Sequence, residues 1–176
     1  MRVVCAFTHI APGVAEALDA TGHPWEAVDV SGSDEDYWAL LAGLWADGRC
    51  FINVEHDVIV RPDTLAELEA CPQPWCGFPL PYLGGEYPGL GCVKFDASII
   101  AAVPDALVQA GRMSNGNHPP KHWCTTDHFL QMVVLPAAVG HGKHVHWPAL
   151  GHWRPYDDGL PQPSHGCCGT RVKETE

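Results

Sequence analysis

Apolar and polar residues alternate along this chain in blocks that predict strands followed by helices. Short apolar runs rich in β-branched residues, at 2–7, 24–30 and 49–60, predict three strands. Each run is followed by a segment with helical spacing bounded by Gly or Pro, and these segments are 14–22, 34–48 and 61–71. From Cys50 to Val54 the third run is almost continuously apolar, which is typical of a central parallel strand covered on both faces.

The second half of the chain continues the pattern with more interruptions. Further strands are predicted at 74–83, 87–95 and 143–150, and a helix at 96–111 is interrupted or restarted at Pro104. Residues 112–124 are expected to form a loop. Thr125 or Thr126 is expected to cap a last helix over 127–140, just as Ser31 or Ser33 is for the helix at 34–48.

This alternation predicts an α/β fold with a mostly parallel, Rossmann-like sheet and helices on both faces. A chain of 176 residues suits one domain, which we expect over 1–154. Residues 155–176, rich in Gly, Pro and charge, are expected to form a flexible tail. Ligands of such sheets bind at the carboxyl ends of strands, where Glu55-His56-Asp57 follows the third strand.

Composition narrows the range of functions. With a net charge of −11 and only 10 Lys plus Arg, the chain lacks the broad basic surface that duplex nucleic acid requires, although a modified nucleobase is not excluded as an acceptor. No stretch approaches the roughly 20 apolar residues of a membrane span, and the N-terminal apolar run is too short for a signal peptide. A cytoplasmic location is the expectation.

The eight Cys are expected to be reduced thiols, because several lie inside apolar runs. The sequence contains no CxxC pair, so a structural zinc site of that type is not indicated. Eleven His keep a zinc-dependent alternative open. Two clusters would have to combine to form that site. The first contains His118, His122, Cys124 and His128, and the second contains His141, His144 and His146. The sequence HPPKH, at 118–122, cannot be helical, which weakens its spacing as a metal motif.

The acidic turn after the third strand is the foremost candidate for chemistry. Because alternate residues of an extended segment point the same way, Glu55 and Asp57 are expected to face one ligand while His56 faces elsewhere. Mn²⁺ and Mg²⁺ prefer such hard oxygen donors and commonly bridge substrate phosphates. The alternative is an ordinary strand-to-helix turn.

The segment FINVEHDVIVRPDTL resembles nucleotide-sugar glycosyltransferases of the GT-A type, including family 2-like members, in which an apolar strand runs into a DxD motif. Here the motif has the variant form Glu-His-Asp, and the chain is shorter than most members. Three further segments follow in the family's order, and they are YPGLGCVKFDASII, TTDHFL and HVHWPALGHWRP. The resemblance covers residues 1 to about 154.

The resemblance implies a role for each matching position. It implies that Asp57 and His152 bind Mn²⁺ or Mg²⁺, with Glu55 reaching the ribose or a metal-bound water. The donor, a UDP-sugar, would lie against residues at the ends of the first three strands, and these are Thr8, His9, Asp29, Glu55 and His56.

On the acceptor side, the resemblance implies a general base at Asp127, so that transfer to a hydroxyl inverts the anomeric carbon. A place at a helix start would keep this carboxylate ionised, although a plain capping role is the alternative. Gly89 and Gly91 would let the backbone approach the sugar, unless they form an ordinary turn. His128 and Trp153 are the remaining substrate candidates, and either can instead be a packing residue.

The sequence therefore predicts a metal-dependent glycosyltransferase that uses a nucleotide sugar. Two alternatives stay open: a nucleotidyltransferase of related fold, and a His-rich zinc-binding protein or hydrolase. The first lacks support from a Gly-rich, basic phosphate loop, because THIAPG follows the first strand.

Overall fold

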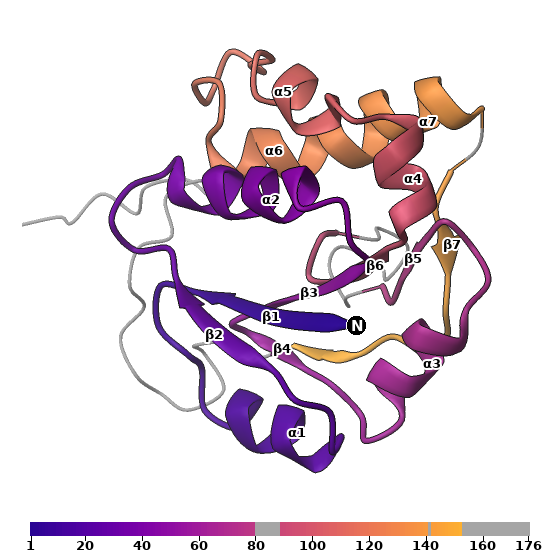
Figure 1. Ribbon diagram of the computed structural model, residues 1–176. Coiled ribbons are helices and arrows are strands. Elements are labelled where there is room, and N and C mark those ends of the chain that lie inside the picture. The colour runs from indigo at the N-terminus through magenta and orange to yellow at the C-terminus, as the bar shows by residue number, and fades with distance from the viewer. Residues whose placement is uncertain (80–88, 141, 153–176) are drawn as a thin grey trace, which may run out of the picture.

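The computed structural model describes residues 1–79, 89–140 and 142–152, and its centre is a six-stranded sheet (Figure 1). The strand order is β2-β1-β3-β6-β5-β7. In chain order the strands are β1 (Arg2–Phe7), β2 (Glu26–Asp29), β3 (Phe51–Glu55), β5 (Trp75–Gly77), β6 (Cys92–Phe95) and β7 (His144–Val145). All run in one direction except β6, which is antiparallel to both neighbours. A two-stranded sheet pairs β4 (Val58–Ile59) with β8 (Gly151–His152).

Helices cover both faces of the large sheet, as Figure 1 shows. On one face lie α2 (Asp36–Ala46), α4 (Ala97–Ala102), α5 (Ala106–Ala110), α6 (Trp123–Phe129), the π-helical turn η1 (Leu130–Val134) and α7 (Leu135–Val139). On the other face lie α1 (Val14–Ala20) and α3 (Thr64–Ala70). The α/β prediction, with a mostly parallel sheet and helices on both faces, is confirmed.

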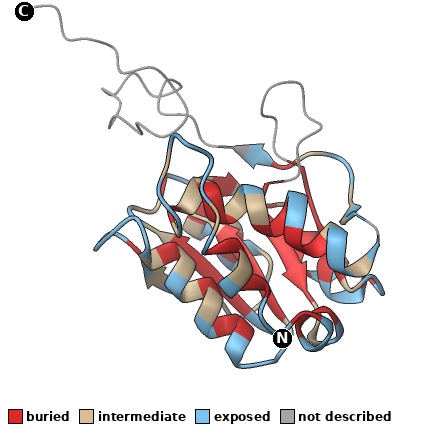
Figure 2. Cartoon of the chain, turned by 90° about the horizontal axis from the view of Figure 1, so that it is seen from above, coloured by how far each residue is buried: buried red, intermediate tan, exposed pale blue. Residues whose placement is uncertain are grey.

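Two apolar cores result from the alternation of side chains along the strands. In β1, Val4 and Ala6 belong to the core under α2, while Val3 and Cys5 belong to the core against α1 and α3. All four are buried, which explains why the strand sequences are apolar on both faces. Figure 2 shows the buried strands between helices whose outer faces are exposed.

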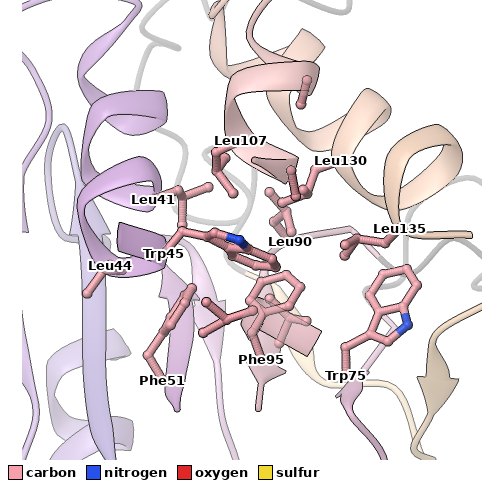
Figure 3. Packing of buried hydrophobic residues seen from close by; sticks show 14 of the residues in the cluster. Leu41, Leu44, Trp45, Phe51, Trp75, Leu90, Phe95, Leu107, Leu130 and Leu135 are labelled. Atoms are coloured by element: carbon pink, nitrogen blue, oxygen red, sulfur yellow. The ribbon is translucent and has the colours of Figure 1, made fainter. Parts of the chain in front are cut away.

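Aromatic rings fill the core under α2 (Figure 3). The Phe95 ring lies 5.3 Å from the rings of both Trp45 and Phe51, and it stacks on Trp75 at 6.3 Å. The indole N–H of Trp45 donates to the carbonyl of Val103 over 2.9 Å, so this large side chain is buried with its polar atom satisfied. The core joins α2 and α4 to β3 and β6, the strands that lead to the candidate site.

Helix starts differ from the sequence prediction at two places. The helix expected from residue 127 begins at Trp123, and its cap is His122, whose Nδ1 accepts the amide N–H of Cys124. The hydroxyl of Thr125 donates a hydrogen bond to the preceding carbonyl of His122 over 2.7 Å, and Thr126 is buried inside the helix. Neither threonine therefore caps α6. The prediction that Ser31 or Ser33 caps the helix at 34–48 is also wrong, because the N-cap residue of α2 is Glu35.

The strand predicted over 143–150 is shorter, since only His144 and Val145 pair in the large sheet. The strand predicted over 74–83 pairs at Trp75–Gly77, and its end lies outside the described residues. Trp153 and the predicted tail 155–176 also lie outside them. Within the described part of the chain, no helix combines the length and apolar character of a bilayer span.

Candidate active site

The carboxyl ends of β1 and β3 bring four of the predicted nucleotide-side residues together. Ala6 pairs with Glu55, so the residues after each strand meet at the same edge. The rings of His9 and His56 lie 4.9 Å apart, and the hydroxyl of Thr8 lies 3.3 Å from Nδ1 of His9. These side chains line one rim of the sheet, as the strand order predicts.

Asp29 lies at the same edge, where β2 ends beside Phe7. Its side chain is exposed, and its Oδ1 accepts the amide N–H of Ser31 over 2.8 Å. Hydrogen bonds from Ser31 lower the pKa of Asp29. This carboxylate is therefore ionised at neutral pH and stands at the outer end of the rim.

The small sheet sets the chain near residue 152 beside the acidic turn. Asp57 lies in the turn between β3 and β4, and the antiparallel register pairs Val58 with His152. Close approach of the strands depends on Gly151, because a Cβ there would lie 3.0 Å from Cβ of Ile59. Two segments separated by about 95 residues in the sequence thus meet next to Asp57.

Glu55 occupies the inner part of this edge. Its Oε1 accepts a hydrogen bond from the hydroxyl of Tyr37 over 3.1 Å, and that hydroxyl in turn accepts a hydrogen bond from the side-chain amide of Asn53 over 2.9 Å. Burial, together with the charges of Asp57 and Asp127, raises the pKa of Glu55 to about 8, while the Tyr37 hydrogen bond opposes the shift. Three carboxylates therefore share one small region, which disfavours ionisation of Glu55 in the absence of a cation.

The turn Gly89-Leu90-Gly91 connects Glu55 with Asp127. The amide N–H of Glu55 donates to the carbonyl of Gly91 at 2.8 Å, and the amide N–H of Leu90 donates to Oδ1 of Asp127 at 3.1 Å. A Cβ added at Gly89 would lie 3.7 Å from Oδ2 of Asp127, so the open side of this glycine faces that carboxylate. Its contact with a sugar stays a prediction.

Asp127 lies within α6 and not in its first turn. The prediction that the helix dipole keeps its carboxylate ionised is therefore wrong. Burial raises the pKa of Asp127 to about 6. This value includes opposing contributions from the charge of Lys143, the Leu90 amide and the side chain of Gln131, each of which lowers the pKa. The neighbouring His128 packs edge-on against the ring of Phe129, with 5.1 Å between ring centroids.

Lys143 is a site residue that sequence reasoning missed. Its ammonium donates to the carbonyl of Gly89 over 3.0 Å and to Oε1 of Gln131 over 2.7 Å, and the amide of Gln131 donates to Asp127. Burial lowers the pKa of Lys143 to about 8, and the charge of Asp127 opposes this shift. The lysine is thus a cation placed among the carboxylates, and the only signal in the sequence was a charged residue at the start of an apolar strand.

Gly77 makes room for this ammonium. A Cβ at position 77 would lie 2.7 Å from the carbonyl oxygen of Cys92 and 3.3 Å from Nζ of Lys143. Only glycine leaves space for both groups.

Glu55 and Asp57 have the donor chemistry of a hard divalent cation site, although in the described part of the chain no group of three ligand atoms within 4.8 Å of one another includes either residue. Glu55 and Asp57 offer carboxylate oxygens, and the charges of both also raise the pKa of the buried Cys5 thiol, although burial is the larger cause. A cation at this edge would offset the charges of Asp57 and Asp127, which add to the effect of burial on the pKa of Glu55.

The predicted histidine clusters behave differently. The rings of His118 and His122 stack at 4.2 Å, but Nδ1 of His122 is used as a helix cap. His141 lies outside the described residues. In the described part of the chain, the ligand atoms of the two clusters do not gather into a site, and the group of three that does gather is Cys71, Cys76 and His146.

No protein family and no curated protein matches this sequence. Among solved structures, the chain is similar to the crystal structure of a glycosyltransferase involved in the glycosylation of the major capsid of PBCV-1. The fold is shared. The TM-score is 0.53 over 84% of this chain and 81% of the other, and the sequences are 13% identical. At this identity the likeness concerns the fold alone.

Proposed function

We propose that this protein is a glycosyltransferase that moves a sugar from a nucleotide diphosphate donor, a UDP-sugar, to a hydroxyl acceptor. The observation that carries the proposal is the meeting of three segments at one sheet edge. They are the acidic turn at 55–57, the strand that ends at residue 152, and the turn at 89–91 with Asp127 behind it. The fold shared with a solved glycosyltransferase supports this assignment.

The nucleotide would lie along the rim formed by the ends of β1, β2 and β3. His9 and His56 present adjacent imidazole rings, and Thr8 adds a hydroxyl. Asp29, at the outer end, would accept hydrogen bonds from the ribose or the base. Such a rim at the carboxyl ends of parallel strands is where α/β sheets bind ligands.

Mn²⁺, or Mg²⁺, is the proposed cofactor. Asp57 and His152 would bind it, and Glu55 would reach a metal-bound water or the ribose. A bound divalent ion supplies Lewis-acid stabilisation of the diphosphate as the glycosidic bond breaks. Imidazole among the ligands favours Mn²⁺ over Mg²⁺.

Asp127 is the proposed general base. In its ionised form it would remove the proton of the acceptor hydroxyl, and direct displacement would then invert the anomeric carbon. Lys143 lowers the pKa of Asp127 and thereby increases the ionised fraction at neutral pH. Gly89 and Gly91 form the backbone beside the reacting sugar, and His128 and Trp153 are the proposed acceptor contacts.

A donor-hydrolysis screen tests the class and the donor together. The protein is incubated with individual nucleotide sugars and Mn²⁺, and release of the nucleoside diphosphate is measured. We expect slow release from one donor, and a higher melting temperature with UDP plus Mn²⁺ than with either alone.

Asp57→Asn should abolish both the release and the manganese-dependent shift. Asp105→Asn is the matched control, because that carboxylate is exposed and accepts from Gln109 on α5, outside the site. Absence of release from every donor, together with no shift by UDP plus Mn²⁺, would refute the proposal. Pyrophosphate release from a nucleoside triphosphate plus a sugar phosphate would instead indicate a nucleotidyltransferase.

A further inference from the structure

Cys71, Cys76 and His146 come together on the face of the sheet opposite α2, outside the proposed active site. Cys71 follows α3, Cys76 lies in β5, and His146 follows β7. The parallel pairing of β5 with β7 brings them together, because the amide N–H of His146 donates to the carbonyl of Gly77 at 3.0 Å. The two sulfur atoms and an imidazole nitrogen all lie within 4.8 Å of one another.

The spacing suits one metal ion. Zinc binds thiolate at about 2.3 Å and imidazole at about 2.0 Å, which places tetrahedral ligand atoms about 3.5–3.8 Å apart. Small rotations of the side chains would bring the three atoms to that separation. Both cysteines are buried, so an ion there would be held within the protein.

His146 carries an unused ligand atom. Its Nε2 is buried and makes no hydrogen bond to the described residues, although a buried polar nitrogen ordinarily has a partner. The ring stacks on Phe78 at 5.0 Å and meets His144 edge-on at 4.8 Å. Burial and the charge of His144 lower the pKa of His146, so the imidazole is neutral at pH 7, the form that binds metals.

A buried cation lies next to the two thiols. Lys94 is opposite Cys76 in the strand register, and its ammonium donates to the carbonyl of Cys71. Burial raises the pKa of the Cys76 thiol to about 12, and the charge of Lys94 opposes this shift. Binding of an ion would displace the thiol protons into solvent, and the lysine charge favours the resulting thiolates.

We propose that Cys71, Cys76 and His146 form a zinc site that ties the connection between α3 and β5 to β7. Thiolate and imidazole ligands select zinc, whereas the carboxylates at the acidic turn select harder ions, so the two sites discriminate by chemistry. Three protein ligands leave a fourth position for solvent. Because β7 follows Lys143 directly, the ion would also fix the strand that holds the proposed active-site lysine.

The test measures zinc in the full-length protein under reducing conditions. After dialysis against metal-free buffer, we expect about one zinc ion per chain. Replacement by Co²⁺ should give the absorption of a tetrahedral site with thiolate-to-metal charge transfer. Bound zinc should also protect Cys71 and Cys76 from alkylation, as read by peptide mapping of the wild-type protein, a measurement that requires no variant to fold.

Variants locate the ion. Cys71→Ala, Cys76→Ala and His146→Ala should each lose it, whereas Cys5→Ala, which removes another buried thiol on the same face, should retain it. Asp57→Asn should also retain it, which separates this site from the proposed manganese site. Zinc absent from the wild-type protein, zinc kept by all three ligand variants, or a Cys71–Cys76 disulfide that resists reduction and excludes cobalt would overturn the proposal.

Discussion

The backbone amide of Leu90 donates to Oδ1 of Asp127 over 3.1 Å, joining a turn before β6 to a helix 37 residues further along the chain. The carbonyl of the same residue accepts from Asn53 at 2.9 Å. One residue of the glycine turn therefore links β3, which carries Glu55, to the proposed base. The relative position of the two carboxylates thus depends on the backbone of one turn residue, which binds the side chains of both Asn53 and Asp127.

Asp127→Asn should retain the fold and lose transfer. Asparagine offers a carbonyl oxygen to the Leu90 amide at the same position, but it cannot accept a proton from an acceptor hydroxyl. We expect kcat to fall by about 10²–10⁴-fold, the usual contribution of a general base. The melting temperature shift with UDP plus Mn²⁺ should stay, which shows that donor binding is intact. Turnover within a few-fold of wild type would rule out Asp127 as the base.

The pH dependence of kcat/KM should show a rising limb near pH 6. Burial raises the pKa of Asp127 to about 6, so its basic form is lost as pH falls through that value. Activity should therefore be low at pH 5 and approach a plateau above the pKa of Asp127. The profile is measured at saturating Mn²⁺, so that metal binding does not contribute. A rate that stays constant down to the ordinary pKa of an aspartic acid, about 4, would contradict this assignment.

Lys143→Met should move that rising limb to higher pH. The lysine charge lowers the pKa of Asp127, so its removal leaves burial less opposed and the pKa rises. Methionine keeps most of the side-chain volume beside Gly77. Lys121→Met is the matched control, because that ammonium pairs with Glu35 at the surface. We expect an unchanged profile for the control, and an equally unchanged profile for Lys143→Met would show that the lysine does not act on the base.

Tyr37→Phe should destabilise the protein by about 1–3 kcal/mol, the usual cost of leaving a buried polar group without its partner. The hydroxyl donates to Glu55 and accepts from Asn53, and phenylalanine leaves both side chains short of one hydrogen bond. Denaturant unfolding measures the change. A double-mutant cycle with Glu55→Ala isolates the pair, because the tyrosine change should cost less once the glutamate is absent. Identical costs in both backgrounds would refute the coupling.

Gly77→Ala should lower the free energy of unfolding by about 1–3 kcal/mol, because a Cβ there meets the backbone carbonyl of Cys92, which cannot move easily. The same change presses on Nζ of Lys143. Gly43→Ala is the control, since its Cβ would meet nothing within 4 Å in the exposed middle of α2. Alanine at position 43 should stabilise the helix by about 0.5–1 kcal/mol. Equal effects at both positions would contradict the steric explanation.

Much of the fold was predictable because local patterns report burial. The apolar runs of β1 and β3 indicated strands covered on both faces, and the alternation with helical segments indicated a mostly parallel sheet. Chain order then placed Glu55 and Thr8 at one edge, since parallel strands end on the same side.

Element boundaries were less predictable. Thr125 looked like a cap, but its hydroxyl bonds backward to His122 within a helix that had already begun. Side-chain hydrogen bonds of Ser and Thr compete among several nearby backbone groups, so residue type alone does not select one. Because that helix begins at Trp123, Asp127 lies beyond its first turn, and burial rather than the helix dipole is the main influence on the pKa of Asp127.

The sequence by itself determined the α/β pattern and the edge that holds the acidic turn, because both follow from the period of apolar residues and from strand direction. Only the tertiary structure decided the partners. Sheet pairing and helix packing bring together residues up to 75 positions apart in the sequence. These pairs are Lys143 with Gln131, Tyr37 with Glu55, and Cys71 with His146. Contacts of this kind depend on where whole elements lie in space, which no local periodicity encodes.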